Sequence, residues 1–171
     1  MKKMLTALSL LMCGCLGYPE TVQPVNGFEL QRYLGKWYEI ARFDHSFERG
    51  LESVTAEYSM RADGGVRVRN RGFSQKNSEW KESIGKAYFV DREDLGYLKV
   101  SFFGPFYGSY VIFELDTQDY QYAFVTSSKK SYVWLLSRTP QVPEKLKERF
   151  KNELRDKGYD PGKLIWVKQD E

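Results

Sequence analysis

The stretch Gly35-Lys36-Trp37-Tyr38-Glu39 opens the first of a series of short extended segments, and this series decides the fold. Apolar and polar residues alternate within the segments, as they do on strands whose successive side chains point to opposite faces. No helical pattern of useful length separates them, so the crossover helices that parallel strands need are missing. The predicted strands cover residues 37–43, 54–60, 66–71, 83–89, 97–102, 109–115, 122–126 and 132–137. We therefore predict an all-β fold, an eight-stranded up-and-down antiparallel barrel, which is just wide enough to hold one small ligand.

A helix follows the predicted strands. Pro143 suits its first turn, and Gly158 suits its end. Leu146, Phe150 and Leu154 lie four residues apart and form one apolar stripe. We expect this C-terminal α-helix to pack against the outside of the barrel, and a last short strand to follow over 164–167.

Composition limits the class of protein. The chain has 171 residues, of which 42% are apolar and 16% aromatic, enough for one domain with a core. The formal net charge of +3 is too small for a nucleic-acid-binding protein, and no dense Lys/Arg stripe appears. We predict no nucleic-acid partner.

The N-terminus has the pattern of a secretory signal peptide. Lys2 and Lys3 precede an apolar run over 4–12, which is too short for a permanent transmembrane helix. A buried helix at the start of the domain is the alternative. The end of the segment resembles the lipobox of bacterial lipoproteins, with Cys15 as the acylated residue. We therefore expect a signal peptide over 1–14, a lipidated tether over 15–26 and a barrel domain over 27–171.

Leu16, the residue after the cysteine, is not the Asp that acts as an inner-membrane retention signal in bacterial lipoproteins. The resemblance therefore implies attachment to the outer membrane through the acylated Cys15, with the domain exposed to the periplasm.

Three separated motifs resemble the lipocalin family. These are the Gly35-to-Glu39 stretch at the first strand, Asp119-Tyr120 in the turn before the seventh strand, and Arg138 at the end of the eighth. The resemblance covers residues 27 to about 168 and is closer still to the bacterial outer-membrane lipocalins, in stretches 39–45, 47–51, 85–87 and 102–108.

A barrel that holds a dry lumen needs one closed end. A guanidinium on the last strand can stack on an indole of the first strand, and it can also donate hydrogen bonds to carbonyls near Gly35. Trp37 and Arg138 are therefore expected to be structural closure residues. The family resemblance adds Asp119 and Tyr120, so the expected closure set is Gly35, Trp37, Asp119, Tyr120 and Arg138.

Strand parity predicts the lumen lining if charged residues face water and their neighbours face inward. The ligand-binding positions expected on this basis are Val54, Ala56, Tyr58, Met60, Val68, Asn70, Ser83, Gly85, Ala87, Phe89, Leu98, Val100, Phe102, Val111, Phe113, Tyr132 and Trp134. Small residues among them leave space that aromatic residues border, which favours a cavity over a filled core. A filled core is the alternative.

The usual catalytic and metal-binding patterns are missing. His45 is the only histidine, so neither a zinc site nor a Ser-His-Asp arrangement is indicated, and we expect a solvated or loop-capping residue. No glycine-rich phosphate loop is present. The sequence therefore predicts no metal, no cofactor and no catalytic residue.

The resemblance implies a lipid carrier that stores or transports a fatty acid or lysophospholipid for membrane maintenance. Lys129 and Lys130, before the eighth strand, are either headgroup ligands or a solvated charge pair. Two other classes stay open: an enzyme acting on an apolar substrate, and an envelope structural or assembly lipoprotein with an incidental cavity. The sequence also allows a homodimer.

Overall fold

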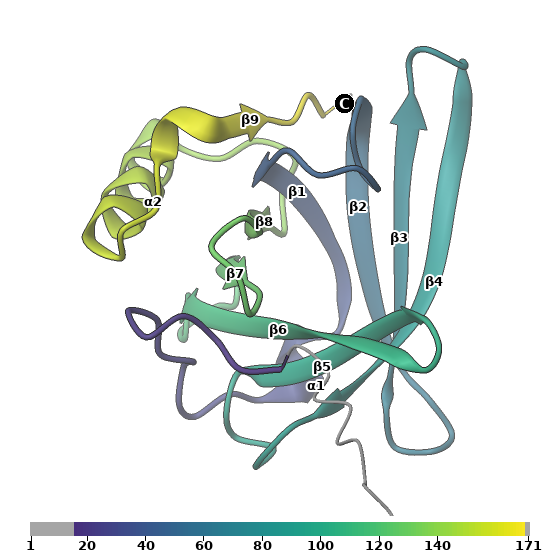
Figure 1. Cartoon of the computed structure of the whole chain (residues 1–171), viewed down its shortest axis with the longest axis vertical. Helices are drawn as coiled ribbons and strands as arrows, with labels where there is room; N and C mark the ends of the chain where they lie inside the picture. Colours follow the sequence, from purple (N-terminus) through teal and green to yellow (C-terminus); the bar gives the residue numbers. More distant parts are fainter. Residues whose placement is uncertain (1–15, 170–171) are drawn as a thin grey trace, which may run out of the picture.

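A computed structural model describes residues 16–169 of the chain (Figure 1). The expected signal peptide and the acylation position Cys15 lie outside the described residues. The strands are β1 (Gly35–Phe43), β2 (Leu51–Met60), β3 (Val66–Ser74), β4 (Glu79–Phe89), β5 (Tyr97–Phe103), β6 (Phe106–Leu115), β7 (Tyr122–Thr126), β8 (Val133–Ser137) and β9 (Leu164–Trp166). The helices are α1 (Leu30–Tyr33), α2 (Glu144–Asp156) and the 3-10 turn η1 (Pro161–Lys163).

The strands form one antiparallel barrel. Each of β2 to β7 pairs with its successor, β8 pairs with β1, and β1 pairs with β2, which closes the sheet. The helix α2 lies outside the strands, as Figure 1 shows. The predicted all-β, up-and-down barrel with an external C-terminal helix is confirmed.

The first strand changes partners along its length. Residues 35–38 of β1 pair with β2, whereas residues 41–43 pair with β9. The C-terminal segment continues this contact, because the Gln169 side chain donates to the carbonyls of Glu39 (2.7 Å) and Val54 (3.0 Å). The end of the chain therefore bridges β1 and β2 where the two strands separate.

Two apolar clusters lie on opposite sides of the barrel wall. The inner cluster includes Trp37, Tyr58 and Leu98. The outer one holds α2 against the strands, where the Phe150 ring lies 4.7 Å from the Phe124 ring and Leu154 is fully buried. The predicted stripe on α2 thus packs on the barrel wall.

The described part of the expected tether packs against the barrel from Gly17 onward. Val22 is fully buried in the outer cluster, and the backbone N–H of Val25 donates to the carbonyl of Ile112 (2.9 Å). The Gly17 N–H donates to the Tyr97 hydroxyl. The apolar Val22, which lies between Pro19 and Pro24, explains this packing.

The closed end of the barrel is built around Trp37 and Arg138. The guanidinium carbon of Arg138 lies 3.9 Å from the centre of the fully buried indole ring. Arg138 also donates to the carbonyls of Lys36 (3.0 Å), Arg32 (2.8 Å) and Tyr120 (3.2 Å). One side chain thus connects β8 to α1, β1 and the turn before β7.

Two other closure predictions have different outcomes. Tyr120 is buried, and its hydroxyl accepts a hydrogen bond from the Glu29 N–H (3.0 Å). The Asp119 side chain is exposed, whereas Asp116 accepts from the backbone N–H groups of Gln118 and Gln121. The prediction for Asp119 is wrong, because the backbone N–H groups of this turn point toward the carboxylate of Asp116 instead.

We predict that Trp37→Ala and Arg138→Ala are strongly coupled. Loss of the buried indole should cost about 3–5 kcal/mol of unfolding free energy. Once it is lost, removing the guanidinium should cost less, with a coupling of about 0.5–3 kcal/mol in a double-mutant cycle measured by urea denaturation. Arg149→Ala, an exposed arginine on α2, is the matched control and should be additive with Trp37→Ala. Additivity in the Trp37–Arg138 cycle would contradict the prediction.

Candidate functional site: the barrel cavity

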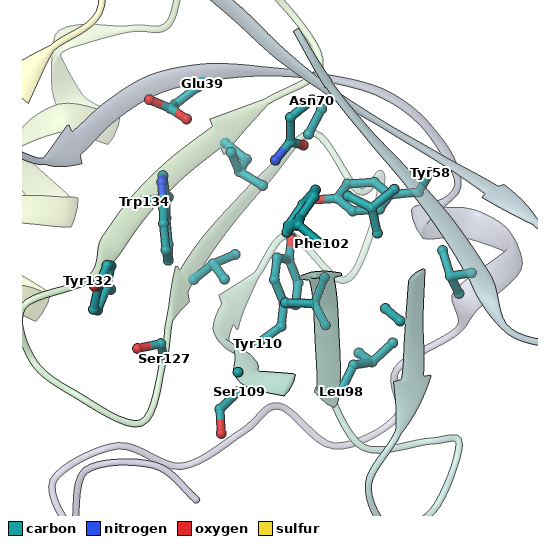
Figure 2. Close-up of a pocket in the computed structure, with 18 of the residues that line it drawn as sticks. Glu39, Tyr58, Asn70, Leu98, Phe102, Ser109, Tyr110, Ser127, Tyr132 and Trp134 are labelled. Atoms are coloured by element: carbon teal, nitrogen blue, oxygen red, sulfur yellow. Dashed lines mark hydrogen bonds between the residues drawn. The ribbon is translucent and has the colours of Figure 1, made fainter. Parts of the chain in front are cut away.

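The barrel encloses a cavity of about 380 Å³, a size typical of small-molecule sites (Figure 2). Its wall is largely apolar and comes from strands on all sides of the barrel. Eleven of the predicted positions line it: Val54, Ala56, Tyr58, Val68, Asn70, Ala87, Leu98, Val100, Phe102, Tyr132 and Trp134. The alternation of side chains along the strands therefore predicted most of the cavity wall correctly. That these residues bind a ligand stays a prediction.

Val111 and Phe113 do not line the cavity. They lie in the outer cluster, whereas Tyr110 and Ile112 of the same strand face inward. A bulge between Ile112 and Glu114 in the pairing with β7 is the cause. The prediction assumed strict alternation from the outward-facing Glu114 back to Val111. The bulge adds one residue to this stretch, so the side chains before it point to the opposite face from the one predicted.

Four further predicted positions do not line the cavity. Met60 is 44% exposed at the end of β2, and Phe89 packs against Phe28 beneath the cavity. Gly85 lies where β4 meets β5, with no room for a side chain. Ser83 lines a second groove that adjoins the cavity.

Three tyrosines that line the cavity form a hydrogen-bonded chain. The Tyr110 hydroxyl lies 2.7 Å from the hydroxyl of Tyr33 and 2.7 Å from that of Tyr58, and Figure 2 shows Tyr58 and Tyr110 pointing toward one another. Burial raises the pKa of all three hydroxyls, so they are neutral donors. Three O–H groups sharing two hydrogen bonds leave one hydrogen able to donate to a ligand.

Two carboxyl groups also line the cavity, which the sequence interpretation did not expect. Glu39 and Glu48 are 4% and 7% exposed. Arg42, buried beside them, donates to the Glu39 carboxylate (2.8 Å) and to the backbone carbonyl of Glu48 (2.9 Å). The Trp134 indole N–H donates to the Glu48 carboxylate (3.2 Å).

The signal for Glu39 was present in the sequence. Glu39 shares the parity of Trp37, which was expected at the closed end and is buried in the inner cluster. A bulge between Glu39 and Ala41 then brings Arg42 to the same face, so that the acid and the base can pair (2.8 Å). The rule that charged residues face water missed both, because a buried ion pair is an exception to it.

His45 is buried rather than solvated. Its Nε2 lies 2.9 Å from a Glu48 carboxylate oxygen, and its ring stacks on Phe47 with ring centres 3.9 Å apart. Burial, followed by the neighbouring Glu48 charge, raises the pKa of Glu39 well above its ordinary value, although Arg42 acts in the opposite direction. Burial in this wall of the cavity therefore favours the protonated form of Glu39.

The mouth of the cavity carries one of the two lysines considered as headgroup ligands. Lys129 lines the mouth, with Ser127 and Ser128. Lys130 is directed elsewhere, because its ammonium group donates to the carbonyl of Lys157 near the end of α2 (2.7 Å).

Residues 16–169 contain neither a metal-binding cluster nor a membrane-spanning helix. No group of three or more His, Cys, Asp or Glu side chains in that range could hold a metal ion. Within the same range, no helix has both the length and the apolar character needed to cross a membrane.

Comparison with known proteins identifies the family. Residues 28–169 match the model of the lipocalin-like domain. The chain belongs to the lipocalin family. This lipocalin is 60% identical to outer membrane lipoprotein Blc of Vibrio cholerae over 94% of each chain, and 47% identical to the protein of the same name from Escherichia coli K12, over 95% of this chain and 92% of that one. These relatives indicate a lipoprotein of the outer membrane.

A solved structure supports the fold of this lipocalin. Insecticyanin from the tobacco hornworm superposes with a TM-score of 0.70, covering 91% of this chain and 88% of that one at 24% identity. Lipocalins are binding proteins for small hydrophobic molecules, and the apolar cavity described above is where such a molecule fits.

We predict that Glu39 makes the stability of this lipocalin fall with rising pH. Above the ordinary pKa of 4.5 the unfolded chain loses this proton, whereas the folded protein keeps it up to the raised pKa. Across that window the free energy of unfolding should fall by up to about 1.4 kcal/mol per pH unit. Glu39→Gln, which keeps an acceptor for Arg42, should flatten the dependence and be more stable than the parent at about pH 8.

Urea denaturation of parent and variant between about pH 5 and 8 measures this dependence. Glu57→Gln, an exposed glutamate on β2, is the matched control and should keep the slope of the parent. Equal slopes for Glu39→Gln and the parent would contradict the prediction.

Proposed function

We propose that this lipocalin is an outer-membrane-anchored carrier that stores or transports a single-chain lipid, a fatty acid or a lysophospholipid, in its barrel cavity. The observation that carries the proposal is an apolar cavity closed at one end by Trp37 and Arg138 and bordered at its mouth by polar residues. An acyl chain fits the apolar part, and a polar head fits the mouth.

The energetics favour a chain of this kind. A sixteen-carbon tail carries about 15 buried CH₂ or CH₃ groups, which contribute at most about 12 kcal/mol at roughly 0.8 kcal/mol each. Association costs about 4–15 kcal/mol, so polar contacts must supply part of the affinity. The Oδ1 atom of Asn70 is buried in the cavity wall without a hydrogen-bond partner among residues 16–169, and it can supply such a contact.

The two rival functions fit the cavity less well. Glu39 and Glu48 are an acid pair of the kind that a general acid–base catalyst needs. However, each is already engaged, Glu39 by Arg42 and Glu48 by His45 and Trp134, so we propose that they orient a ligand and do not catalyse a reaction. A purely structural or assembly lipoprotein would need neither the cavity nor its unpartnered polar atom.

We predict that palmitate and lysophosphatidylcholine each bind at micromolar concentration or tighter and quench tryptophan fluorescence, because Trp134 lines the cavity. Trp134→Phe should bind but lose most of the quenching. Ala56→Phe fills the cavity and should weaken binding at least about tenfold, whereas Glu57→Phe, its outward neighbour, should not. A flat titration, or recovery of a hydrolysed lipid, would overturn the proposal.

We further propose that Cys15 is acylated and holds the protein to the outer membrane with its domain in the periplasm. Several acyl chains are needed for stable attachment, because one chain holds only marginally. Mass spectrometry of the mature N-terminus should find a lipid-modified Cys15. Cys15→Ser should release a protein that still binds ligand, since the described barrel begins after this residue. Cleavage at another position, or an unmodified thiol, would contradict this.

A further inference from the structure

The barrel wall is split on one side. β4 pairs with β3 along residues 79–87, but with β5 only between Lys86–Phe89 and Leu98–Ser101. Residues 79–85 of β4 therefore have no strand partner on the β5 side among the described pairings. Figure 1 shows the β3–β4 hairpin standing apart from the β5–β6 hairpin.

A groove of about 550 Å³ lies at this split, and it is continuous with the cavity. The two share five wall residues: Phe47, Glu48, Val54, Asn70 and Phe102. Ser83 of β4 and the tip of the β5–β6 hairpin complete the groove. The cavity thus extends sideways between β4 and β5 as well as upward through the mouth.

The rim of this opening exposes large aromatic side chains. Phe103 is 83% exposed, Phe106 73% and Phe47 60%, and all three line the groove. Exposed phenylalanines gathered at one opening are unfavourable in water and mark a surface that another apolar phase covers.

Cations flank these rings. Arg71 and Lys81 line the groove, and neither forms an ion pair within residues 16–169. The Arg71 guanidinium lies 4.0 Å from the centre of the Trp80 ring, which is 50% exposed beside the groove. The carboxylate of Glu82, which also lines the groove, forms an ion pair with Arg69, whose Nη2 lies 2.7 Å from Glu82 Oε2. Aromatic rings next to unpaired cations match the acyl boundary and the phosphates of a lipid surface.

We propose that the split between β4 and β5 is a lateral entrance that docks on a phospholipid bilayer. Phe47, Phe103 and Phe106 enter the acyl boundary, and Arg71 and Lys81 face the phosphate groups. A lipid chain then passes between bilayer and cavity without crossing water. This inference rests on the proposed lipid-carrier function and adds the route by which the ligand enters.

The test uses the full chain with Cys15→Ser, so that no acyl anchor contributes to vesicle binding. Phe103→Ser combined with Phe106→Ser should lower partition onto phosphatidylcholine–phosphatidylglycerol vesicles at least about tenfold. Transfer of a fluorescent fatty acid from the vesicles should slow in proportion. Affinity for the same fatty acid in free solution should stay within about twofold, because neither ring lines the main cavity. Met60→Ser, an exposed apolar residue away from the groove, should change none of the three.

A second measurement does not depend on the stability of the double variant. Phe106→Cys carrying a polarity-sensitive fluorophore should shift to the blue on vesicles, and Met60→Cys with the same label should not. Unchanged partition of the double variant, or no shift at position 106, overturns the lateral entrance.

The remaining outcomes separate the rival explanations. If sedimentation shows that the two Phe→Ser changes dissociate a dimer while vesicle partition is unchanged, the opening is an interface between two copies, and the proposal is wrong. If the parent binds no lipid in free solution, the carrier function fails whatever the vesicles show. If the double variant binds lipid in free solution and also takes up lipid from vesicles at the rate of the parent, the lateral entrance is wrong. The carrier function is then unaffected.

Discussion

The contact between Arg138 and Trp37 is the constraint on which the rest of the barrel depends. An eight-stranded sheet closed on itself leaves a tube, and a tube open at both ends would fill with water. The guanidinium covers the indole and ties three backbone segments across one end. Gly35 is required beside it, because its φ of +95° suits only glycine and a Cβ there would lie 3.4 Å from Arg138 Nη1. Once this end is sealed, the space above it can stay apolar.

Alternation and turn residues sufficed to predict the barrel, because period-two patterning reports directly which face of a strand is buried. They located the lumen wall on the strands that run without interruption, such as β3 with Val68 and Asn70. They failed where a bulge shifts the count, as at Val111 and Phe113 on β6. A bulge is decided by the partner strand, and single-strand parity carries no information about it. Asp119 failed for a different reason, since one turn held two acidic residues and only geometry selects between them.

The polar groups inside the cavity change its character from a core to a binding site. A barrel filled for stability alone would use aliphatic side chains, because each buried polar atom without a partner costs about 1–3 kcal/mol. Glu39 and Glu48 are held on the wall by Arg42, His45 and Trp134, so most of their cost is offset. The unpartnered Asn70 oxygen is not offset among the described residues, and a polar ligand atom would supply the missing hydrogen bond.

The two ends of the barrel are built to opposite requirements, and one residue on β4 marks where they meet. A Cβ at Gly85 would lie 2.8 Å from the Ser101 carbonyl oxygen and 2.9 Å from the Phe102 ring, so only glycine lets β4 approach β5 there. On one side of Gly85 the strands are paired down to Phe89, toward the end that Arg138 seals. On the other side the pairing stops and the phenylalanines begin. Because cooperative stability falls where strand pairing and burial fall, the split side can open to admit a chain while the paired side keeps the cavity closed.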